Sequence, residues 1–209
     1  MNENTVELLG WYGGDTTHAL SAWTSTSREL NEERIERIPQ LLKYLADNEH
    51  GTPFEKSCIH FLVRNDIATH IHCLKHRIAV PLNGESARYK ELDEDKYYLP
   101  DDFPSRWRDE LRNHTQRGLN FYHQCLKSLV EEYGFTRKRA KESARYFRTY
   151  NTQIDNDIAF NFRSFVHFQK LRNSYKAQKE VREIAEAMLD LVKSIPNSPF
   201  EYSLSAFEL

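Results

Sequence analysis

Two early segments of the chain show the alternation of an extended backbone. "TVELLGWYG", residues 5–13, is rich in β-favouring residues, and the Gly-Gly-Asp at its end is typical of a strand terminus. "SCIHFLVRN", residues 57–65, places Ile59, Phe61 and Val63 on one face and the residues between them on the other. Both segments are therefore predicted to be strands.

Elsewhere apolar residues recur every three or four positions, which is the period of a helix. "NEERIERIPQLLKYLADNEH" starts with a capping pattern and keeps this spacing in spite of Pro39. "DIATHIHCLKHRIA" is predicted to be a helix capped by Asp66. Further helices are expected from Thr16 or Thr17 onward and over residues 105–133, 136–146 and 160–195. Residues 81–104 predict a loop with a short extended piece, and the Pro-punctuated tail is expected to pack by its aromatics.

Strands early in the chain and helices late predict an α+β fold. The 209 residues are expected to form a single domain, residues 1–209. With 29 basic and 31 acidic residues the net charge is −2, so any anion-binding surface must be a local cluster, which argues against a nucleic-acid-binding protein. No apolar run is long enough to span a membrane and no secretion signal is evident, so a cytoplasmic protein without a membrane partner is expected.

Positive charge and turn residues are concentrated in "KHRIAVPLNGESARYKE", residues 75–91. The basic side chains of this stretch are Lys75, His76, Arg77, Arg88 and Lys90. Guanidinium forks suit phosphate groups or the carbonyls of a heterocycle, and Gly and Ser leave backbone amides free for the same anion. The stretch therefore favours a nucleotide-like ligand. The alternative is a solvated basic loop whose charge balances that of the acidic run at residues 91–95.

A polar stripe borders apolar residues in the predicted helix from residue 160. Its members are Asn161, Arg163, Ser164, His167 and Arg172. Polar groups in so apolar a helix are usually buried only with partners. The stripe indicates either a binding site or the hydrogen-bonded edge of an ordinary amphipathic helix.

Other kinds of site have weaker support. His72 and His76 are four residues apart on a predicted helix, a spacing that metal ligands use, but Lys75 and Arg77 beside them would repel a dication. No metal site is therefore expected. The three cysteines lie far apart, and the chain has no nucleophile elbow, phosphate-binding loop or dinucleotide fingerprint. Catalysis by a nucleophile of the protein is weakly supported.

Three segments together resemble the flavin-dependent thymidylate synthase family. "HGTPFEK", residues 50–56, is similar to the family's H-x-S/T-P-F-E-H. "KHRIAVPLNGESARY" is similar to its R-H-R, seven residues, S-x-R-Y. "NFRSFVHFQKLRNSYKAQKEVR" is similar to its N-x-R-S-x-x-(N/H)-F-x-x-L-R helix and the A-Q-x-E-(I/V)-R beyond it. The resemblance runs from about residue 6 to residue 199, with the segments in the family's order.

The resemblance implies a fold of antiparallel strands packed with long helices and a role for each matching residue. The flavin would be surrounded by Thr52, Glu55, Lys75, His76, Arg77, Asn161, Arg163 and His167. The nucleotide would be held by His72, Ser86, Ala87, Arg88, Arg145 and Arg172. Among these, Arg172 would be catalytic, because it favours the N3-deprotonated uracil ring whose C5 is nucleophilic.

The implied reaction is C5 methylation of a uracil mononucleotide, most simply dUMP to dTMP. The methylene would come from 5,10-methylenetetrahydrofolate and the hydride from reduced FAD, which NADPH regenerates. A homotetramer with sites at subunit interfaces is implied, so that Ser86 to Arg88 would serve a neighbouring subunit.

The chain departs from the family's pattern in the basic stretch. Lys75 replaces the first Arg, eight residues rather than seven separate Arg77 from Ser86, and Gly84 takes the usual acidic position after Asn83. These departures leave open the same fold acting on UMP, or transferring a hydroxymethyl group, in a specialised nucleotide pathway. A non-catalytic nucleotide- or RNA-binding protein is a further alternative.

Overall fold

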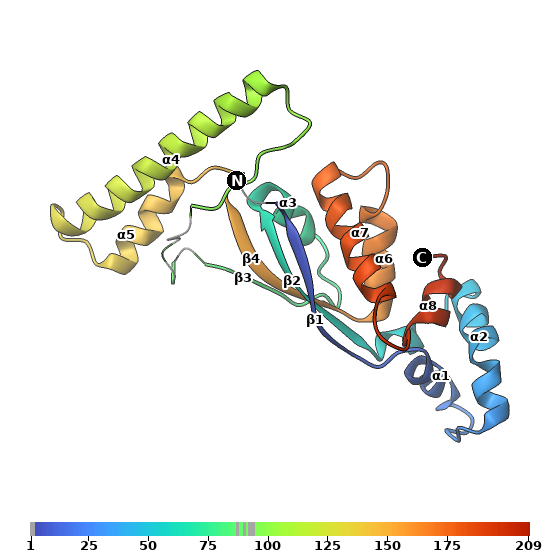
Figure 1. Cartoon of the computed structure of the whole chain (residues 1–209). Helices are drawn as coiled ribbons and strands as arrows, with labels where there is room; N and C mark the ends of the chain where they lie inside the picture. Colours follow the sequence, from blue (N-terminus) through green and yellow to red (C-terminus); the bar gives the residue numbers. More distant parts are fainter. Residues whose placement is uncertain (1–2, 87, 90, 92–94) are drawn as a thin grey trace. The chain divides into compact units, whose positions relative to one another are not determined.

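The computed structural model has the expected α+β architecture, with a four-stranded antiparallel sheet and several helices (Figure 1). It describes residues 3–86, 88, 89, 91 and 95–209. The strands are β1 (Thr5–Tyr12), β2 (Cys58–Asp66), β3 (Leu82–Gly84) and β4 (Gln153–Phe160), in the order β1-β2-β4-β3. The helices are α1 (Asp15–Trp23), α2 (Glu32–Asp47), α3 (Ile67–Cys73), α4 (Ser105–Glu131), α5 (Arg137–Ala144), α6 (Phe162–Arg172), α7 (Lys179–Lys193) and α8 (Glu201–Ala206). Two short 3₁₀ helices, η1 (Thr52–Glu55) and η2 (Arg145–Phe147), complete the set.

The chain divides into two compact units, and each is described by itself. Unit 1 contains the chain up to Thr5, Arg64–Ile71 and Gly84–Asn156. Unit 2 contains Val6–Val63, His72–Asn83 and Asp157–Leu209. The expected single domain stays a prediction.

The main core lies in unit 2, between the sheet and helices α6 and α7. The face of β2 with Ile59, Phe61 and Val63 is fully buried, as its alternation predicts. Phe61 stacks on Phe165 of α6 at a centroid distance of 6.2 Å. On α7 the buried apolar residues recur at helical spacing, and five of them belong to the same cluster: Ile184, Ala185, Met188, Leu189 and Val192. This core fixes α6, which carries the polar stripe, against the sheet.

Unit 1 has a smaller core between α4 and α5, which lie side by side in Figure 1. Tyr122 and Leu126 of α4 pack with Ala140 and Ala144 of α5. Thr136 caps α5 by accepting a hydrogen bond from the Arg139 amide. The small alanines let the two helices approach closely.

Helix caps follow the sequence prediction at the starts of α2 and α3. Asn31 accepts a hydrogen bond from the Arg34 amide at 3.0 Å and starts α2, which runs through Pro39. Asp66 accepts hydrogen bonds from the amide and hydroxyl of Thr69 at 2.9 and 2.8 Å and so fixes the start of α3. Both side chains satisfy amides that a helix start leaves without partners.

The prediction of one helix over residues 160–195 is wrong. Strand β4 occupies the chain up to Phe160, and the helical part is divided into α6 and α7. The hydrophobic pattern did not reveal this strand because one of its inward positions is polar. Asn156 is 2% exposed and donates a hydrogen bond to Asn65 on β2 at 2.9 Å. The break follows Arg172, where Asn173 and Ser174 favour local hydrogen bonds over a helix interior.

A chain of buried hydrogen bonds ties the C-terminal helix to the start of unit 2. The Ser203 hydroxyl donates to Asp15 at 2.5 Å, and the two ring nitrogens of His18 lie 2.9 Å from the hydroxyls of Ser203 and Ser57. Asp15 also accepts the amides of Tyr202 and Ser203. The tail therefore does more than pack its aromatics: it forms α8, and its Ser203 belongs to this network.

Among the helices of the described residues, none combines the length and apolar character that a membrane-spanning segment needs.

Candidate active site

A cavity of about 360 Å³ lies at the N-terminal end of α6 in unit 2. Its walls come from three parts of the sequence: Glu55 of η1, residues 75–80 after α3, and Asn161, Arg163, Ser164 and His167 of α6 and its cap. Asn161 caps α6 by accepting the Ser164 amide at 2.8 Å, and the Ser164 hydroxyl donates to the Ile78 carbonyl at 2.9 Å. These bonds hold the basic segment against the helix start.

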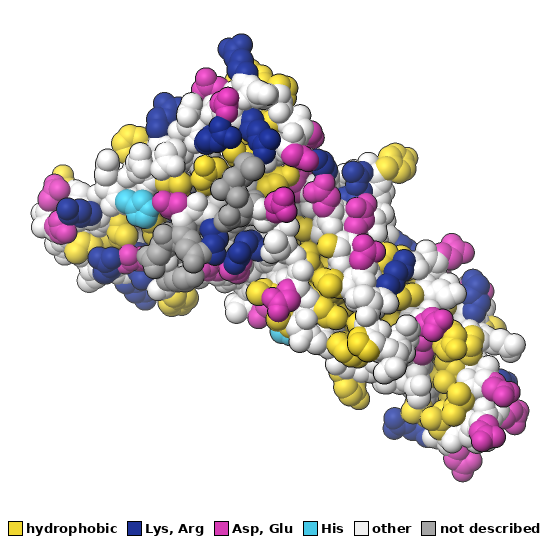
Figure 2. All heavy atoms as spheres, viewed as in Figure 1, with side chains coloured by type: hydrophobic (Ala, Val, Ile, Leu, Met, Phe, Trp, Pro, Cys, Tyr) yellow, Lys and Arg dark blue, Asp and Glu magenta, His cyan; other side chains and the backbone are white. Residues whose placement is uncertain are grey.

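The cavity carries positive charge that the protein does not neutralise. Arg163 pairs with Glu55 at 2.7 Å, but Lys75 and Arg77 form no ion pair with any other residue that the structure describes. Elsewhere the charges are mixed, and Figure 2 shows acidic and basic side chains interspersed over the visible face. Uncompensated cations at a helix N-terminus favour an anionic ligand.

His76 connects this cavity to Arg172 at the other end of α6. Arg172 Nε donates to His76 Nε2 at 2.9 Å, and Arg172 Nη2 donates to the His72 carbonyl at 3.4 Å. The ring of His76 packs edge-on against Phe168 at a centroid distance of 4.9 Å. Burial, the charge of Arg172 and the neighbouring His167 lower the pKa of His76 to about 4. His76 is therefore neutral at physiological pH.

A second cavity of about 600 Å³ adjoins the first and shares Arg163 and His167 with it. Its other walls come from the end of α2, from Gly51 and Lys170, and from the C-terminal residues around Phe207. Lys170 lies over the ring of Phe207 at 5.5 Å. Two ligands bound in the two cavities would thus meet at Arg163 and His167.

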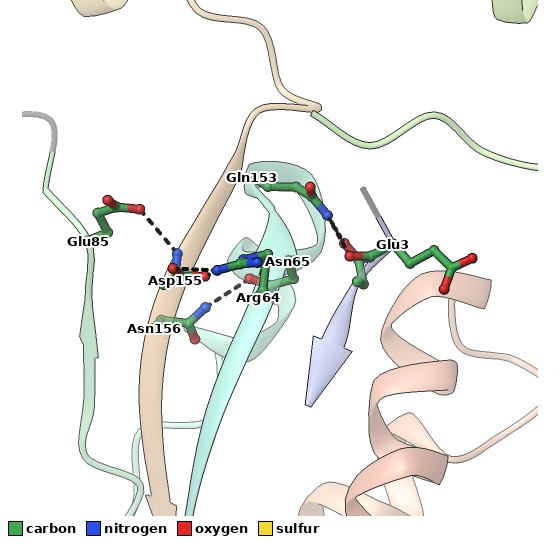
Figure 3. A network of polar contacts seen from close by, with 8 residues as sticks. Glu3, Arg64, Asn65, Glu85, Gln153, Asp155 and Asn156 are labelled. Atoms are coloured by element: carbon green, nitrogen blue, oxygen red, sulfur yellow. Dashed lines mark hydrogen bonds and ion pairs between the residues drawn. The ribbon is translucent and has the colours of Figure 1, made fainter. Parts of the chain in front are cut away.

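A polar network in unit 1 fixes the segment that leads to Ser86 (Figure 3). The Glu85 amide donates to the Asp155 carbonyl at 2.8 Å, and the Glu85 carboxylate accepts the Asp155 amide at 3.4 Å. Arg64 holds the Asp155 side chain with two hydrogen bonds at 2.7 and 3.0 Å. Ser86 therefore follows a segment that is anchored to β4.

The residues after Ser86 are held by α5. Arg88 Nε donates to Glu142 at 3.1 Å, and Lys141 donates to the Tyr89 carbonyl at 2.9 Å. Arg145 begins η2 directly after α5 and is exposed. A phosphate at Arg88 would therefore share its guanidinium with Glu142.

The structure brings most of the predicted flavin residues together in unit 2, and the predicted nucleotide residues are divided between the two units. Glu55, Lys75, His76, Arg77, Asn161, Arg163 and His167 all line the first cavity. Thr52 begins η1, the helix that Glu55 ends. His72 and Arg172 meet in unit 2, whereas Ser86, Arg88 and Arg145 belong to unit 1, and Ala87 lies outside the described residues.

One expectation about this region changes. His72 and His76 do not share a helix face, because α3 ends at Cys73 and His76 lies in the turn that follows. Within the part of the chain that the structure describes, no three His, Cys, Asp or Glu side chains are grouped to hold a metal. The sequence also missed Val80, which forms part of the cavity wall and is 8% exposed. Val80 lies in a short irregular stretch between Ala79 and Pro81, where the sequence gives no periodic signal.

A known family matches nearly the whole chain. Residues 7–197 match the family model described as thymidylate synthase complementing protein. The chain belongs to this family, the flavin-dependent thymidylate synthases. It is accordingly an enzyme of the methyltransferase type, which counts against the non-catalytic alternative. The family's name implies a flavin cofactor.

Individual members of the flavin-dependent thymidylate synthase family are similar over most of their length. A flavin-dependent thymidylate synthase from Pseudothermotoga lettingae is 31% identical over 198 residues, which cover 93% of this chain and 87% of the relative. One from Wolbachia pipientis wMel is 27% identical and covers 99% of this chain and 77% of the relative. Among solved structures, the UMP/dUMP methylase PolB from Streptomyces cacaoi bound with 5-Br dUMP has a TM-score of 0.80 at 25% identity, with 99% of this chain and 95% of that chain covered.

Proposed function

We propose that this protein methylates C5 of a uracil mononucleotide, most simply dUMP, with FAD as cofactor and with 5,10-methylenetetrahydrofolate and NADPH as co-substrates. The observation that carries the proposal is the cationic cavity at the start of α6, which His76 links to Arg172. The cytoplasm is the proposed location, because it supplies these small molecules.

The residues of the first cavity fit a flavin. A cavity of about 360 Å³ lies within the size range of small-molecule sites. Lys75 and Arg77 would stabilise the negative charge of phosphates or of the reduced ring, and Asn161 and Arg163 would offer polar contacts at its edge. When bound, FAD would supply the hydride that completes the methyl group.

Arg172 would act on the uracil ring. Its Nη1 has no hydrogen-bond partner among the residues that the structure describes, so these N–H donors are available to a ligand. A guanidinium beside a uracil carbonyl stabilises the ring deprotonated at N3, because negative charge then collects on the oxygen. The electron-rich ring is nucleophilic at C5, and the protein needs no attacking cysteine.

The nucleotide phosphate would be held by Ser86, Ala87, Arg88 and Arg145, with His72 nearer the base. Arginine forks are suited to phosphate oxygens. In the proposed homotetramer these unit 1 residues would complete the site of a neighbouring subunit.

The test of the proposed function is a purification followed by two parallel assays. We expect a yellow protein, or one that FAD reconstitutes, that converts dUMP when methylenetetrahydrofolate and NADPH are supplied. UMP is assayed separately under the same conditions. A colourless protein that cannot be reconstituted with FAD would contradict the proposal.

A second candidate keeps the fold but takes UMP, or transfers a hydroxymethyl group. The similarity to PolB, which is described as acting on both UMP and dUMP, favours this candidate. The extra residue before Asn83 also lies in the segment that would hold the ribose. Turnover of dUMP without binding or turnover of UMP would exclude the ribonucleotide version.

Gly51→Ala is expected to weaken flavin binding while leaving the fold intact. A Cβ at this position would lie 2.6 Å from Arg163 Nε, and the flexible Arg163 side chain would move away from Glu55. We expect the dissociation constant for FAD to rise roughly tenfold, which corresponds to about 1.4 kcal/mol. Fluorescence titration with FAD measures this.

The control for this experiment is Gly10→Ala, because no atom lies within 4 Å of the added Cβ. FAD affinity equal to wild type in Gly51→Ala would show that Arg163 does not contact the flavin.

A further inference from the structure

The hydrogen bond between His76 and Arg172 joins two residues of the candidate site. The two residues are 96 positions apart in the sequence, and their side-chain nitrogens are 2.9 Å apart. An arginine side chain remains protonated in proteins and can only donate. His76 Nε2 must therefore be the acceptor, and the single proton of the neutral ring must lie on Nδ1.

The surroundings of His76 hold it in this state. Arg172 and His167 face it from α6, with His167 edge-on at a centroid distance of 5.8 Å. Lys75 and Arg77 flank it in the chain, and the Arg163–Glu55 pair lies in the same cavity. A second proton on the ring would remove the acceptor and add a cation to a cationic site, and burial opposes the charge further.

The contact also restricts how Arg172 can move. Nε is bound by His76 and Nη2 by the His72 carbonyl, so two donors on one edge of the guanidinium are engaged by the protein. The plane of the group is thereby fixed, and Nη1 remains available. Preorganised donors cost no reorganisation when charge develops on a substrate.

We propose that His76 is a positioning residue for the reaction: its unprotonated Nε2 orients Arg172 for the uracil ring, in addition to any contact that His76 makes with the flavin. This rests on the proposed function. The two roles differ in which ring nitrogen matters, because only Nε2 meets Arg172.

The test is a matched pair of amide variants. In His76→Gln the side-chain oxygen reaches about as far as Nε2, whereas in His76→Asn it reaches only as far as Nδ1. With FAD saturating, we expect kcat/KM for the nucleotide to stay within about tenfold of wild type in the Gln variant. In the Asn variant we expect a fall on the order of 10²-fold, the cost of a misplaced catalytic group. His76→Leu should match the Asn variant, and His114→Leu, an exposed histidine of α4, should match wild type.

A second readout does not depend on turnover. In protein labelled with ¹⁵N-arginine, the Nε–H signal that is absent from Arg172→Lys belongs to Arg172. We expect this signal to be protected from exchange in wild type and His76→Gln and to lose protection in His76→Asn. If wild type turned over neither dUMP nor UMP, the proposed function would fail, and this signal alone would still decide the positioning role.

Two results would overturn the inference. One is an Arg172 Nε–H signal that is equally protected in the Asn and Gln variants. The other is full recovery of kcat/KM by both variants at saturating FAD, which would make His76 a flavin contact only. Because the two amides differ by one methylene, they also control for folding: a general loss of stability would affect both thermal midpoints.

Discussion

Replacing Arg172 with lysine is expected to lower kcat/KM for the uracil nucleotide by about 10²- to 10³-fold, the usual effect of removing a preorganised donor. Lysine retains the charge but loses the planar fork, so it cannot be held by His76 and the His72 carbonyl while also binding a ligand. The loss should appear in kcat as well as KM, because the interaction with the deprotonated ring is strongest in the transition state. Steady-state kinetics at saturating FAD measure both.

The control for Arg172→Lys is the same substitution at Arg182 on α7, whose guanidinium lies 3.7 Å from Glu186. This residue is outside the candidate site, and we expect its kinetics within twofold of wild type. FAD content is measured for each protein, so that loss of cofactor is not mistaken for loss of chemistry. Retention of a third or more of the wild-type kcat/KM by Arg172→Lys would contradict the assigned role.

His18→Leu is expected to lower the free energy of unfolding by about 3 kcal/mol at pH 7. His18 is fully buried, and its loss leaves the hydroxyl of Ser57 without its ring partner and that of Ser203 with Asp15 alone. A buried hydroxyl deprived of a partner costs about 1–3 kcal/mol. Urea denaturation measures the change, and the exposed His114→Leu is expected to shift stability by less than about 0.5 kcal/mol.

The same variant has a predictable pH dependence. Burial lowers the pKa of His18 to about 4, below the value of about 6.5 in an unfolded chain. Its contribution to stability is therefore complete above pH 6.5 and is lost as the pH falls toward 4, because the unfolded state binds the proton more tightly. Over this pH range the loss of the His18 contribution lowers the free energy of unfolding by about 3 kcal/mol.

The difference in stability between wild type and His18→Leu should therefore shrink as the pH falls from 6.5 to 4. Burial raises the pKa of Asp15, but Asp15 is present in both proteins, so its titration largely cancels in the difference. A difference that stays constant over this range would show that His18 titrates normally in the folded protein.

Local sequence was sufficient to predict an element where the contacts that stabilise the element are themselves local. The caps Asn31, Asp66 and Thr136 each bond an amide three residues ahead, and all three helix starts were predicted within one or two residues. The buried face of β2 followed from alternation alone. The basic residues of segment 75–77 and the polar stripe of α6 were likewise chosen from residue type and spacing.

Strand β4 shows why local sequence failed elsewhere. Its inward Asn156 is acceptable only because Asn65, 91 residues away, offers a hydrogen-bond partner. A polar residue at a core position breaks the hydrophobic pattern, and its partner is invisible until the strands are paired. The division between α6 and α7 was missed because the apolar spacing of a helix continued across Asn173 and Ser174. The prediction gave this spacing more weight than the low helix propensity of those two residues.

The sequence by itself determined the fold class, most helix and strand positions, the family resemblance and the residue types of the candidate site. Only the tertiary structure decided which residues meet: Lys75, Arg77 and Arg163 line one cavity, Arg172 bonds His76, and Ser203 bonds Asp15. The reason is physical. Caps and periodicity act within a few residues, whereas a hydrogen bond between distant side chains forms only when packing brings donor and acceptor within about 3 Å.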